Sequence, residues 1–307
     1  MPMIRTHLVP PSAAGWSLVV HGGAGGRIAE LSAQRTSAFR AGLTAAHGAG
    51  ADVLSAGGSA VDAVCAAVGA LEDDPLFNAG RGAALTLQGT VELDASIMTG
   101  DGRAGAVAVV DRARSPIRVA RHVMEATPHV LLASPDDALV EAAGVELMDP
   151  DYFVTEARRR QLERILADEE APLTHGTVGA VARDSAGRIV AGTSTGGISK
   201  QLRGRIGDTP IIGAGTWARD GVVGISCTGD GEAFIQGAVA HDVFARMAYG
   251  RQSVAEAASS TFAAECDTRG STGGLIAVTG DGSVLLCHNS AMMLAAFSQD
   301  GETVTWV

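Results

Sequence analysis

The 307-residue chain is poor in aromatic and charged residues and lacks features that would assign it to several protein classes. Aromatic residues make up 4% and charged residues 19% of the chain, whereas hydrophobic residues make up 46%. No apolar stretch approaches the ~20 residues of a membrane-spanning helix. The net charge is −11, and no run of lysine or arginine concentrates positive charge as nucleic-acid binding requires. We therefore expect neither a transmembrane helix nor a nucleic-acid partner.

Cysteine is also scarce, and its spacing excludes common cysteine-based sites. The four residues Cys65, Cys227, Cys266 and Cys287 are widely separated and form no CxxC pair, so we predict reduced thiols in or near the core rather than a metal site or a disulfide framework. The first twelve residues lack the cationic head and apolar core of a secretory signal. We expect a cytoplasmic protein.

Glycine, in contrast, is abundant. The chain has 40 glycines, about 13% of its residues against a usual ~7%, in short clusters between apolar runs. The cluster His21-Gly22-Gly23-Ala24-Gly25-Gly26 follows a predicted strand over 16–20. It fails the dinucleotide-binding fingerprint, because Ile28 stands where the last glycine is required. A flexible turn and the backbone-lined wall of a pocket both remain open.

Hydrophobic periodicity predicts strands that pair locally and helices that come in pairs. We predict helices over 32–47, 59–71, 116–126, 136–143, 231–248 and 253–266. The predicted strands are 16–20, a hairpin of 83–87 with 91–98, then 105–110, 130–132, 177–183, 188–193, 211–212, 222–228, 275–279 and 284–287. This order favours two stacked sheets between helical layers over alternating βαβ units. No convincing internal repeat divides the chain, and we predict a single domain.

The segment 151–171 differs in character from its surroundings. It contains Arg158-Arg159-Arg160 and Asp168-Glu169-Glu170 with few large apolar residues. We interpret it as partly helical, exposed and loosely packed, and such segments tolerate cleavage of the chain. It leads directly to Gly176-Thr177.

Thr177 is the candidate nucleophile. If the chain were cut between Gly176 and Thr177, the threonine hydroxyl would lie beside its own free α-amino group. An α-amine with a pKa of about 7.7–8.0 can act as the base for such a hydroxyl near neutral pH. The alternative is structural, because Gly-Thr-Val is also an ordinary start for a strand.

Further polar residues follow Thr177 at places where they could serve one site. Thr195 ends the neighbouring strand and could bond the nucleophile. Arg205 and Asp208 share a loop, and their opposite charges suit the α-carboxylate and α-ammonium of an amino acid. Thr228-Gly229 joins a strand to a helix, where backbone amides and a hydroxyl could hold an oxyanion. The structural alternatives are a surface ion pair and a helix cap.

Asp94 lies within an apolar predicted strand, where a buried carboxylate must be hydrogen-bonded. A structural acid that bonds nearby backbone amides is the simpler interpretation, and the sequence assigns no function to Asp94 or to His21.

Together these segments resemble a known family along nearly the whole chain. The chain is similar to the plant-type asparaginase/isoaspartyl aminopeptidases of the N-terminal nucleophile hydrolases. Seven motifs carry the resemblance, in the family's order: His21-Gly-Gly-Ala-Gly25, Leu76-Phe-Asn-Ala-Gly80, Glu92-Leu-Asp-Ala-Ser96, Gly176-Thr-Val-Gly-Ala-Val181, Thr193-Ser-Thr-Gly-Gly197, Gly204-Arg-Ile-Gly-Asp208 and Thr228-Gly-Asp-Gly-Glu232.

The resemblance implies an α/β fold, a four-layer αββα sandwich, made as one precursor that cuts itself between Gly176 and Thr177. The products are an α subunit, 1–176, and a β subunit, 177–307, which family members assemble as (αβ)₂. The implied substrates are L-asparagine and β-aspartyl dipeptides. Thr177 attacks, Thr195 orients its hydroxyl, and Thr228 and Gly229 hold the oxyanion. The substrate is bound by Arg205, Asp208 and the backbone of Gly229 and Gly231.

No cofactor is required in this family, although some members bind a structural sodium ion. The corresponding loop is 71–81, and its ligands are mostly backbone carbonyl oxygens. Acidic residues in this loop favour a cation there as well. The residues concerned are Leu71, Glu72, Asp74, Phe77, Ala79 and Arg81.

Two other functions compete with this interpretation. A glycosylasparaginase of the same family would need room for a glycan, although Thr193-Ser-Thr-Gly-Gly197 and the glycine before Thr177 resemble the isoaspartyl branch more closely. A non-enzymatic amino-acid-binding protein with glycine-rich loops predicts an uncut chain and no release of ammonia from asparagine. A threonine protease of the same fold fits less well, because Arg205 and Asp208 suit a small substrate.

Overall fold

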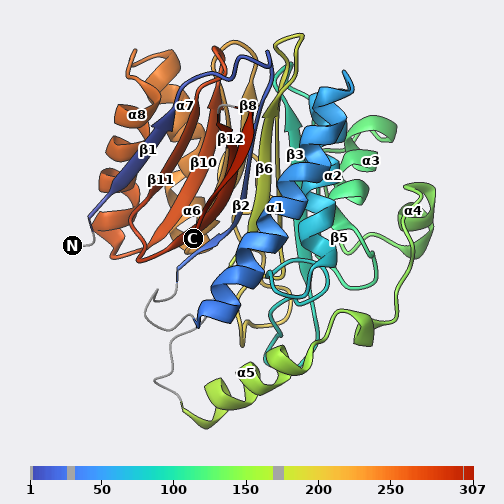
Figure 1. The fold of residues 1–307 in the computed structure, drawn as a ribbon. Helices are drawn as coiled ribbons and strands as arrows, with labels where there is room; N and C mark the ends of the chain where they lie inside the picture. Colours follow the sequence, from blue (N-terminus) through green and yellow to red (C-terminus); the bar gives the residue numbers. More distant parts are fainter. Residues whose placement is uncertain (1–2, 26–31, 169–175, 300) are drawn as a thin grey trace.

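The computed structural model describes residues 3–25, 32–168, 176–299 and 301–307 and contains two β-sheets between layers of helices (Figure 1). In sheet order, the strands of the eight-stranded sheet are β13 (Glu302–Trp306), β12 (Met293–Gln299), β2 (Ser17–Ala24), β6 (Val178–Arg183), β7 (Ile189–Thr195), β3 (Leu93–Thr99), β4 (Ala104–Val110) and β5 (Leu131–Ala133). Those of the five-stranded sheet are β1 (Arg5–Val9), β11 (Val284–His288), β10 (Gly273–Thr279), β9 (Val223–Gly229) and β8 (Thr216–Arg219).

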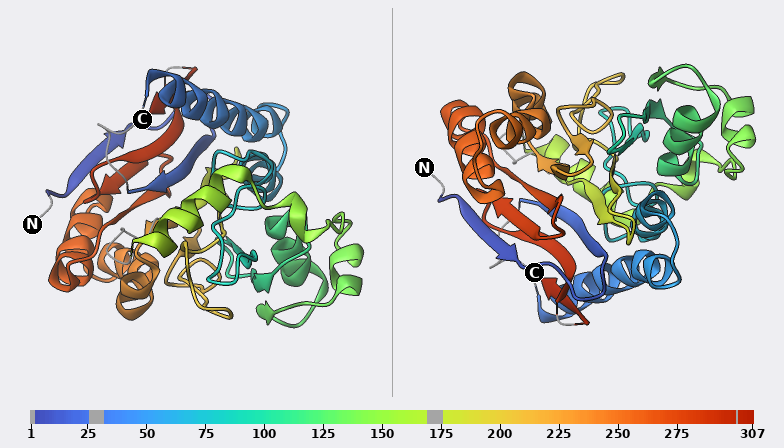
Figure 2. Two further views of the ribbon diagram at one scale, coloured as in Figure 1. Left: turned by 90° about the horizontal axis from the view of Figure 1, so that it is seen from below. Right: turned by 90° about the horizontal axis from the view of Figure 1, so that it is seen from above.

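Helices cover the outer face of each sheet. The eight-stranded sheet is covered by α1 (Ala33–Ser55), α2 (Ala60–Asp73) and α3 (Pro116–Ala126), and the five-stranded sheet by α6 (Gly231–Gly237), α7 (Val239–Ala248) and α8 (Val254–Thr261). The two views in Figure 2 show the sheets between these helical layers. In Figure 1, α4 (Asp137–Ala142) lies beyond α3, and α5 (Glu156–Ala167) lies below the sheets at one end of the sandwich. The αββα sandwich expected from the sequence is confirmed.

Several helices begin at residues that satisfy their free backbone amides. The hydroxyl of Ser59 accepts the N–H of Asp62 at the start of α2, which is the usual bond of a serine N-cap. Pro116 opens α3, where its missing N–H costs nothing. Ser253 and Glu256 form a reciprocal capping box at the start of α8.

The buried apolar side chains form three clusters, one for each interface between layers. One lies between the eight-stranded sheet and α1–α3, one between the five-stranded sheet and its helices, and one between the two sheets. Alternation along a strand assigns each side chain to an interface. In β2, Leu18 and Val20 pack toward the helices and Val19 packs between the sheets. Every second residue of a central strand therefore faces the other sheet.

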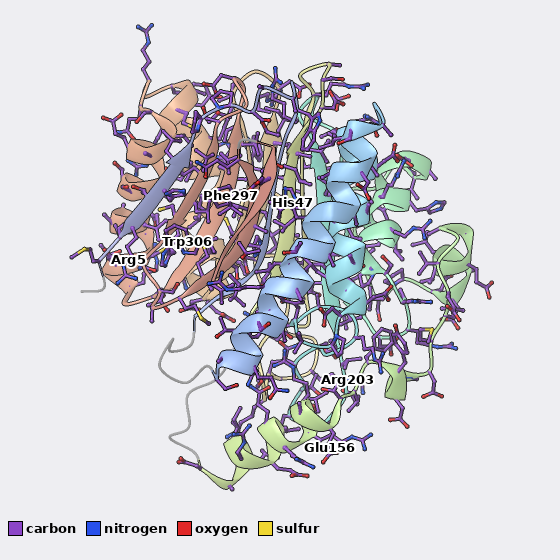
Figure 3. The ribbon with its side chains drawn as sticks, in the orientation of Figure 1. Arg5, His47, Glu156, Arg203, Phe297 and Trp306 are labelled. Atoms are coloured by element: carbon purple, nitrogen blue, oxygen red, sulfur yellow. The ribbon has the colours of Figure 1, made fainter. Side chains whose placement is uncertain are left out.

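Polar contacts also join the first helix to the last strands. His47 of α1 contacts the hydroxyls of Ser298 in β12 and Thr303 in β13, at 3.0 and 3.1 Å (Figure 3). Burial lowers the pKa of His47 to about 4, so its ring stays neutral near pH 7. In the part of the chain that the structure describes, no helix is long and apolar enough to cross a membrane. All four cysteines are buried and free of disulfides, as predicted.

Three predictions about strands are wrong. Residues 83–87 and 91–98 do not form a hairpin, because Thr86 makes only an isolated bridge to Gln201 and β3 pairs with β4 and β7. Ile212 likewise forms only a bridge, to Thr216. The sequence pattern also missed β1, β8, β12 and β13. Buried β12 is apolar on both faces from Met293 to Phe297, so it shows no alternation.

Two helix predictions need correction as well. The helix predicted over 231–248 is two helices, because Ala238 adopts a left-handed conformation with φ of 43° and breaks it between α6 and α7. The described part of 151–171 is partly helical and mostly exposed, as predicted, but it is anchored to the rest of the molecule. Helix α5 buries Leu162 and Ile165, and Arg158 donates to the carbonyl of Gly82 at 2.6 Å. Residues 169–171 lie outside the described residues, as does the rest of the stretch before Gly176.

Candidate active site

Three threonines, two from neighbouring strands of the eight-stranded sheet and one from the five-stranded sheet, face the space between the sheets. Thr177 directly precedes β6, Thr195 ends β7, and Thr228 lies near the end of β9. Each is an even number of residues from a side chain that lies between the sheets, so alternation directs all three into the same layer. Their side chains are buried, with exposed fractions of 5%, 3% and 0%.

The peptide bond before Thr177 is surrounded by hydrogen-bond donors. The Thr177 hydroxyl donates to Thr195 Oγ1 at 3.2 Å, and the Thr195 hydroxyl donates to the carbonyl oxygen of Gly176 at 2.9 Å. Asn78 Nδ2 donates to the same carbonyl oxygen at 2.7 Å. Two donors on one carbonyl oxygen polarise it and can stabilise negative charge that develops there.

Asn78 is a residue that sequence reasoning missed, because its segment was assigned to a family motif and to a sodium loop without a role for Asn78. The structure holds its amide on both sides. Oδ1 accepts the backbone N–H of Ala84 at 2.6 Å, and Nδ2 also donates to the carbonyl of Gly197 at 2.7 Å. Its orientation is therefore set by the loop that it belongs to and by the end of β7. Its place in the Leu76–Gly80 motif was the available signal.

The glycine-rich end of β2 lies between Thr228 and the Gly176–Thr177 peptide bond. The backbone N–H of Ala24 donates to Thr228 Oγ1 at 3.2 Å. The neighbouring Gly23 passes Gly176 so closely that a Cβ atom on it would stand 3.5 Å from the Gly176 Cα. Gly229 has φ of 148°, and a Cβ atom there would lie 2.6 Å from the Cα of Gly273. Glycine is required at that point because no side chain fits.

Arg205 and Asp208 lie together, but their partners differ from the expected ion pair. Arg205 donates through Nε and Nη2 to the two carboxylate oxygens of Glu232, at 2.9 and 2.8 Å. Among the described residues, Oδ2 of Asp208 is buried without a hydrogen-bond partner. A Cβ atom on Gly231 would stand 2.8 Å from Arg205 Nη2 and 2.9 Å from Asp208 Oδ1, so both side chains converge over that glycine.

The charge of Asp208 is disfavoured by its surroundings. Burial raises the pKa of Asp208 to about 7, against the opposing effects of a backbone hydrogen bond and of Arg205. Glu232 pairs with Arg205, which lowers the pKa of that carboxyl. A cationic group beside Asp208 would favour the ionised form. The arrangement of Arg205 and Asp208 is chemically suited to a small molecule that carries both charges.

His21 belongs to a buried polar chain between the two sheets. Its Nε2 lies 2.9 Å from the hydroxyl of Ser226, which is followed by the hydroxyls of Thr193, Thr216 and Ser96 at 2.7, 2.6 and 2.8 Å. Burial lowers the pKa of His21 to about 3, an effect that the backbone of Thr177 only partly opposes. The ring is therefore neutral at physiological pH.

Glu72, one of the acidic residues of the predicted sodium loop, is already hydrogen-bonded within the protein. The carboxylate of Glu72 is buried and accepts from Ser115, Ser194 and the N–H of Ile117, at 2.6, 2.7 and 2.9 Å. Its backbone carbonyl accepts the N–H of Arg81 at 2.7 Å. Within the described ranges, no cluster of three or more His, Cys, Asp or Glu residues is arranged to hold a metal. A sodium ion in this loop would have to bind the remaining carbonyl oxygens.

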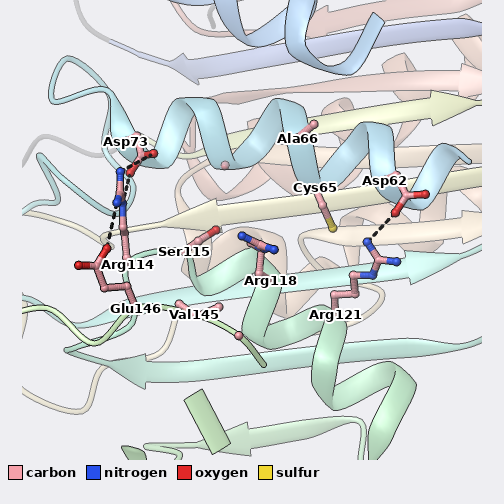
Figure 4. Close-up of a pocket in the computed structure, with 12 residues that line it drawn as sticks. Asp62, Cys65, Ala66, Asp73, Arg114, Ser115, Arg118, Arg121, Val145 and Glu146 are labelled. Atoms are coloured by element: carbon pink, nitrogen blue, oxygen red, sulfur yellow. Dashed lines mark hydrogen bonds and ion pairs between the residues drawn. The ribbon is translucent and has the colours of Figure 1, made fainter. Parts of the chain in front are cut away.

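A cavity of about 620 Å³ between α2 and α3 is lined by none of the predicted site residues (Figure 4). Three arginines and three acids line it, and most of them pair with each other. Arg114 contacts Asp73 and Glu146, and Arg121 contacts Asp62, at 3.1, 3.0 and 2.7 Å. The candidate chemistry therefore rests on the residues around Thr177 and not on this cavity.

Comparisons with known proteins agree with the resemblance noted in the sequence. The model of the asparaginase family Asparaginase_2 matches residues 14–307. The isoaspartyl peptidase of Salmonella typhimurium is 42% identical over 94% of this chain and 96% of its own length. The isoaspartyl peptidase of Escherichia coli is also 42% identical, over 94% of each chain. The human isoaspartyl peptidase/L-asparaginase is 41% identical over 93% of this chain and 94% of its own.

Proposed function

Because the chain belongs to the asparaginase family, we propose that it is a self-processing threonine hydrolase of L-asparagine and β-aspartyl dipeptides. One observation supports this most strongly. The Thr177 hydroxyl, the Thr195 hydroxyl and the Gly176 carbonyl oxygen form a continuous hydrogen-bonded chain at the bond to be cut. A strand start without this chemistry would not need two donors on that carbonyl.

In the first reaction Thr177 Oγ attacks the carbonyl carbon of Gly176. Its proton passes to Thr195, whose own proton passes to the carbonyl oxygen, along the hydrogen bonds described above. Asn78 donates to the same oxygen and stabilises its developing charge. The C–N bond then breaks as the C=O bond re-forms, and the proton on that oxygen passes to the nitrogen, which becomes the α-amine. Water opens the ester and leaves two chains, 1–176 and 177–307.

In the second reaction the freed α-amine of Thr177 accepts the proton of its own hydroxyl. The hydroxyl oxygen attacks the side-chain carbonyl of asparagine or of a β-aspartyl dipeptide, and ammonia or an amino acid leaves with a proton. Thr228 and Gly229 stabilise the oxyanion. Arg205 binds the α-carboxylate and Asp208 the α-ammonium, and the backbone of Gly231 lines the site. Water then releases aspartate.

The assembly and setting of the enzyme are part of the same proposal. Two processed precursors form an (αβ)₂ assembly in the cytoplasm, as the family resemblance implies. No cofactor takes part in either reaction. A structural sodium ion in the loop 71–81 remains a prediction, now restricted to backbone carbonyl ligands because the groups of Glu72 are already hydrogen-bonded.

The direct test is hydrolysis of L-asparagine and of β-aspartyl-leucine by the purified protein, with Thr177→Ala beside it. Thr268→Ala, on the exposed surface, is the matched control. We expect aspartate from both substrates with the wild type and the control and none with Thr177→Ala. Release of aspartate from a glycoasparagine alone would indicate a glycosylasparaginase. An uncut chain that binds asparagine without releasing ammonia would indicate a binding protein.

A further inference from the structure

Three polar side chains on one face of the β3 segment each bond the backbone of the loop that carries Arg205 and Asp208. We name Glu92, Asp94 and Ser96 the β3 ladder. Its bonds are Gly204 N–H to Glu92 Oε2 at 2.8 Å, Gly207 N–H to Asp94 Oδ2 at 3.4 Å, and Ser96 Oγ–H to the Thr209 carbonyl at 2.6 Å. The loop is thus held before, between and after its two charged residues.

Alternation along the strand explains why these three residues share a face. Leu93, Ala95 and Ile97 point the other way and pack in the cluster beneath the helices. The ladder therefore points into the layer between the sheets, where Thr177 and Thr195 also lie.

The same strand contacts the nucleophile side of the site. In the backbone pairing between β3 and β7, Asp94 lies directly opposite Thr195. One short segment thus holds Thr195 through its backbone and the Arg205–Asp208 loop through its side chains. The separation between those two groups is fixed by β3.

Asp94 is held by amides on both of its oxygens. Oδ1 accepts the N–H of Val109 at 3.0 Å, and Oδ2 accepts the N–H of Gly207. Burial raises the pKa of Asp94 to about 6, although these two backbone bonds and Arg205 act in the opposite direction, while Glu92 adds to the rise. An acid kept in a costly buried position at this junction fixes the loop more rigidly than a solvated contact would.

We propose that the β3 ladder sets the substrate length that the site accepts and thereby selects β-aspartyl over γ-glutamyl compounds. The proposal rests on the proposed function, because it takes Thr177 as the nucleophile and Arg205 with Asp208 as the groups that hold the α-carbon. A γ-glutamyl compound has one more methylene between the α-carbon and the carbonyl. Since a misplacement of about 1 Å can cost about 10²-fold in rate, a rigid separation discriminates against the longer chain.

The test is the ratio of kcat/KM for β-aspartyl-leucine to kcat/KM for γ-glutamyl-leucine. Asp94→Asn should lower this ratio about tenfold, because the amide can accept from only one of the two N–H groups and a hydrogen bond to a charged group is worth about tenfold or more. Glu92→Gln should lower it less, since the remaining carbonyl oxygen still accepts from Gly204. Asp101→Asn, in the exposed turn of the β3–β4 hairpin, is the control and should leave the ratio unchanged.

A second pair of variants guards against misfolding of Asp94→Asn. Glu92→Ala removes the acceptor for Gly204 and should lower the ratio, and Glu92→Gln should restore most of it. Equal losses of kcat/KM on both substrates, with an unchanged ratio in every ladder variant, would overturn the proposal and leave β3 a merely structural role. Wild-type protein that hydrolyses neither dipeptide would instead overturn the proposed function on which it rests.

Discussion

The two halves of the candidate active site differ in how completely their polar groups are hydrogen-bonded. Around Thr177 the hydroxyls and the Gly176 carbonyl bond one another, and Asn78 adds a second donor. Around Asp208 one buried carboxylate oxygen has no partner among the described residues. The first half is hydrogen-bonded to the chain's own peptide bond, whereas the second leaves one buried carboxylate oxygen unpaired among the described residues.

This difference fits the two successive reactions that we propose. A buried carboxylate oxygen without a partner lowers stability, and proteins accept such a cost mainly at functional sites. Arg205 shows the contrast within the second half, because Glu232 already holds it in place. The first half has the contacts that the proposed self-cleavage needs, and the second has the charges that the proposed substrate needs.

The largest effect should come from Thr177→Ala, which removes the attacking oxygen from both reactions. We expect no self-cleavage and a loss of hydrolysis of about 10⁶-fold, as for removal of a nucleophile that acts with its partners as a unit. A denaturing gel and an ammonia assay measure the two effects. Two bands from this variant would remove Thr177 from the proposal.

Asn78→Ala should affect the half of the site around Thr177 more than the half around Asp208. It removes one donor from the Gly176 carbonyl, and loss of an oxyanion donor typically costs about 10²–10³-fold in rate. Self-cleavage, followed by intact mass over time, should slow by about that factor.

Asn78 also supports the loop through its bonds to Ala84 and Gly197. The melting temperature of the Asn78→Ala variant is therefore the necessary control. Slower cleavage with an unchanged melting temperature supports the donor role. Cleavage at the wild-type rate would contradict it.

Arg205→Lys should affect only the second half. Lysine keeps the charge but loses the planar pair of donors, so KM for asparagine should rise about tenfold or more while self-cleavage stays complete. Steady-state kinetics measure the first effect and gel analysis the second. An unchanged KM would remove Arg205 from substrate binding.

The smallest expected effect is a pH dependence that follows from Asp208. Its raised pKa, about 7, means that the carboxylate gains a proton as pH falls through that value and can then no longer pair with the substrate ammonium. KM for asparagine should rise about threefold between pH 7.5 and 6.5, and Asp208→Asn should abolish this slope while raising KM at every pH. A KM independent of pH in the wild type would contradict the role of Asp208.

Alternation and local motifs made much of the fold predictable from the sequence. The hairpin of β6 and β7 follows the predicted strands on both sides of Asp184-Ser185-Ala186-Gly187 within two residues. The clustering of Arg205 and Asp208 beside Gly231 was expected from the motifs that carry the resemblance to the family. These features depend on contacts that are close in sequence or on that resemblance.

Contacts between distant segments were harder to predict. Three contacts of the site join residues that are 27 or more positions apart. They are the bond from Asn78 to the Gly176 carbonyl, the pairing of Arg205 with Glu232 and the bond between Asp94 and Gly207. A local pattern carries no information about such partners. The break at Ala238 was missed because alanine otherwise favours a helix. Ala238 is exposed and ends α6 in a left-handed conformation, with its N–H bonded to the carbonyls of Phe234 and Ile235.

The most direct measurement is the intact mass of the purified wild-type protein under denaturing conditions. We predict two chains, with the break between Gly176 and Thr177 and a threonine at the start of the second chain. A single chain of 31.1 kDa that stays uncut on prolonged incubation would contradict self-processing and, with it, the role of Thr177 as an N-terminal nucleophile.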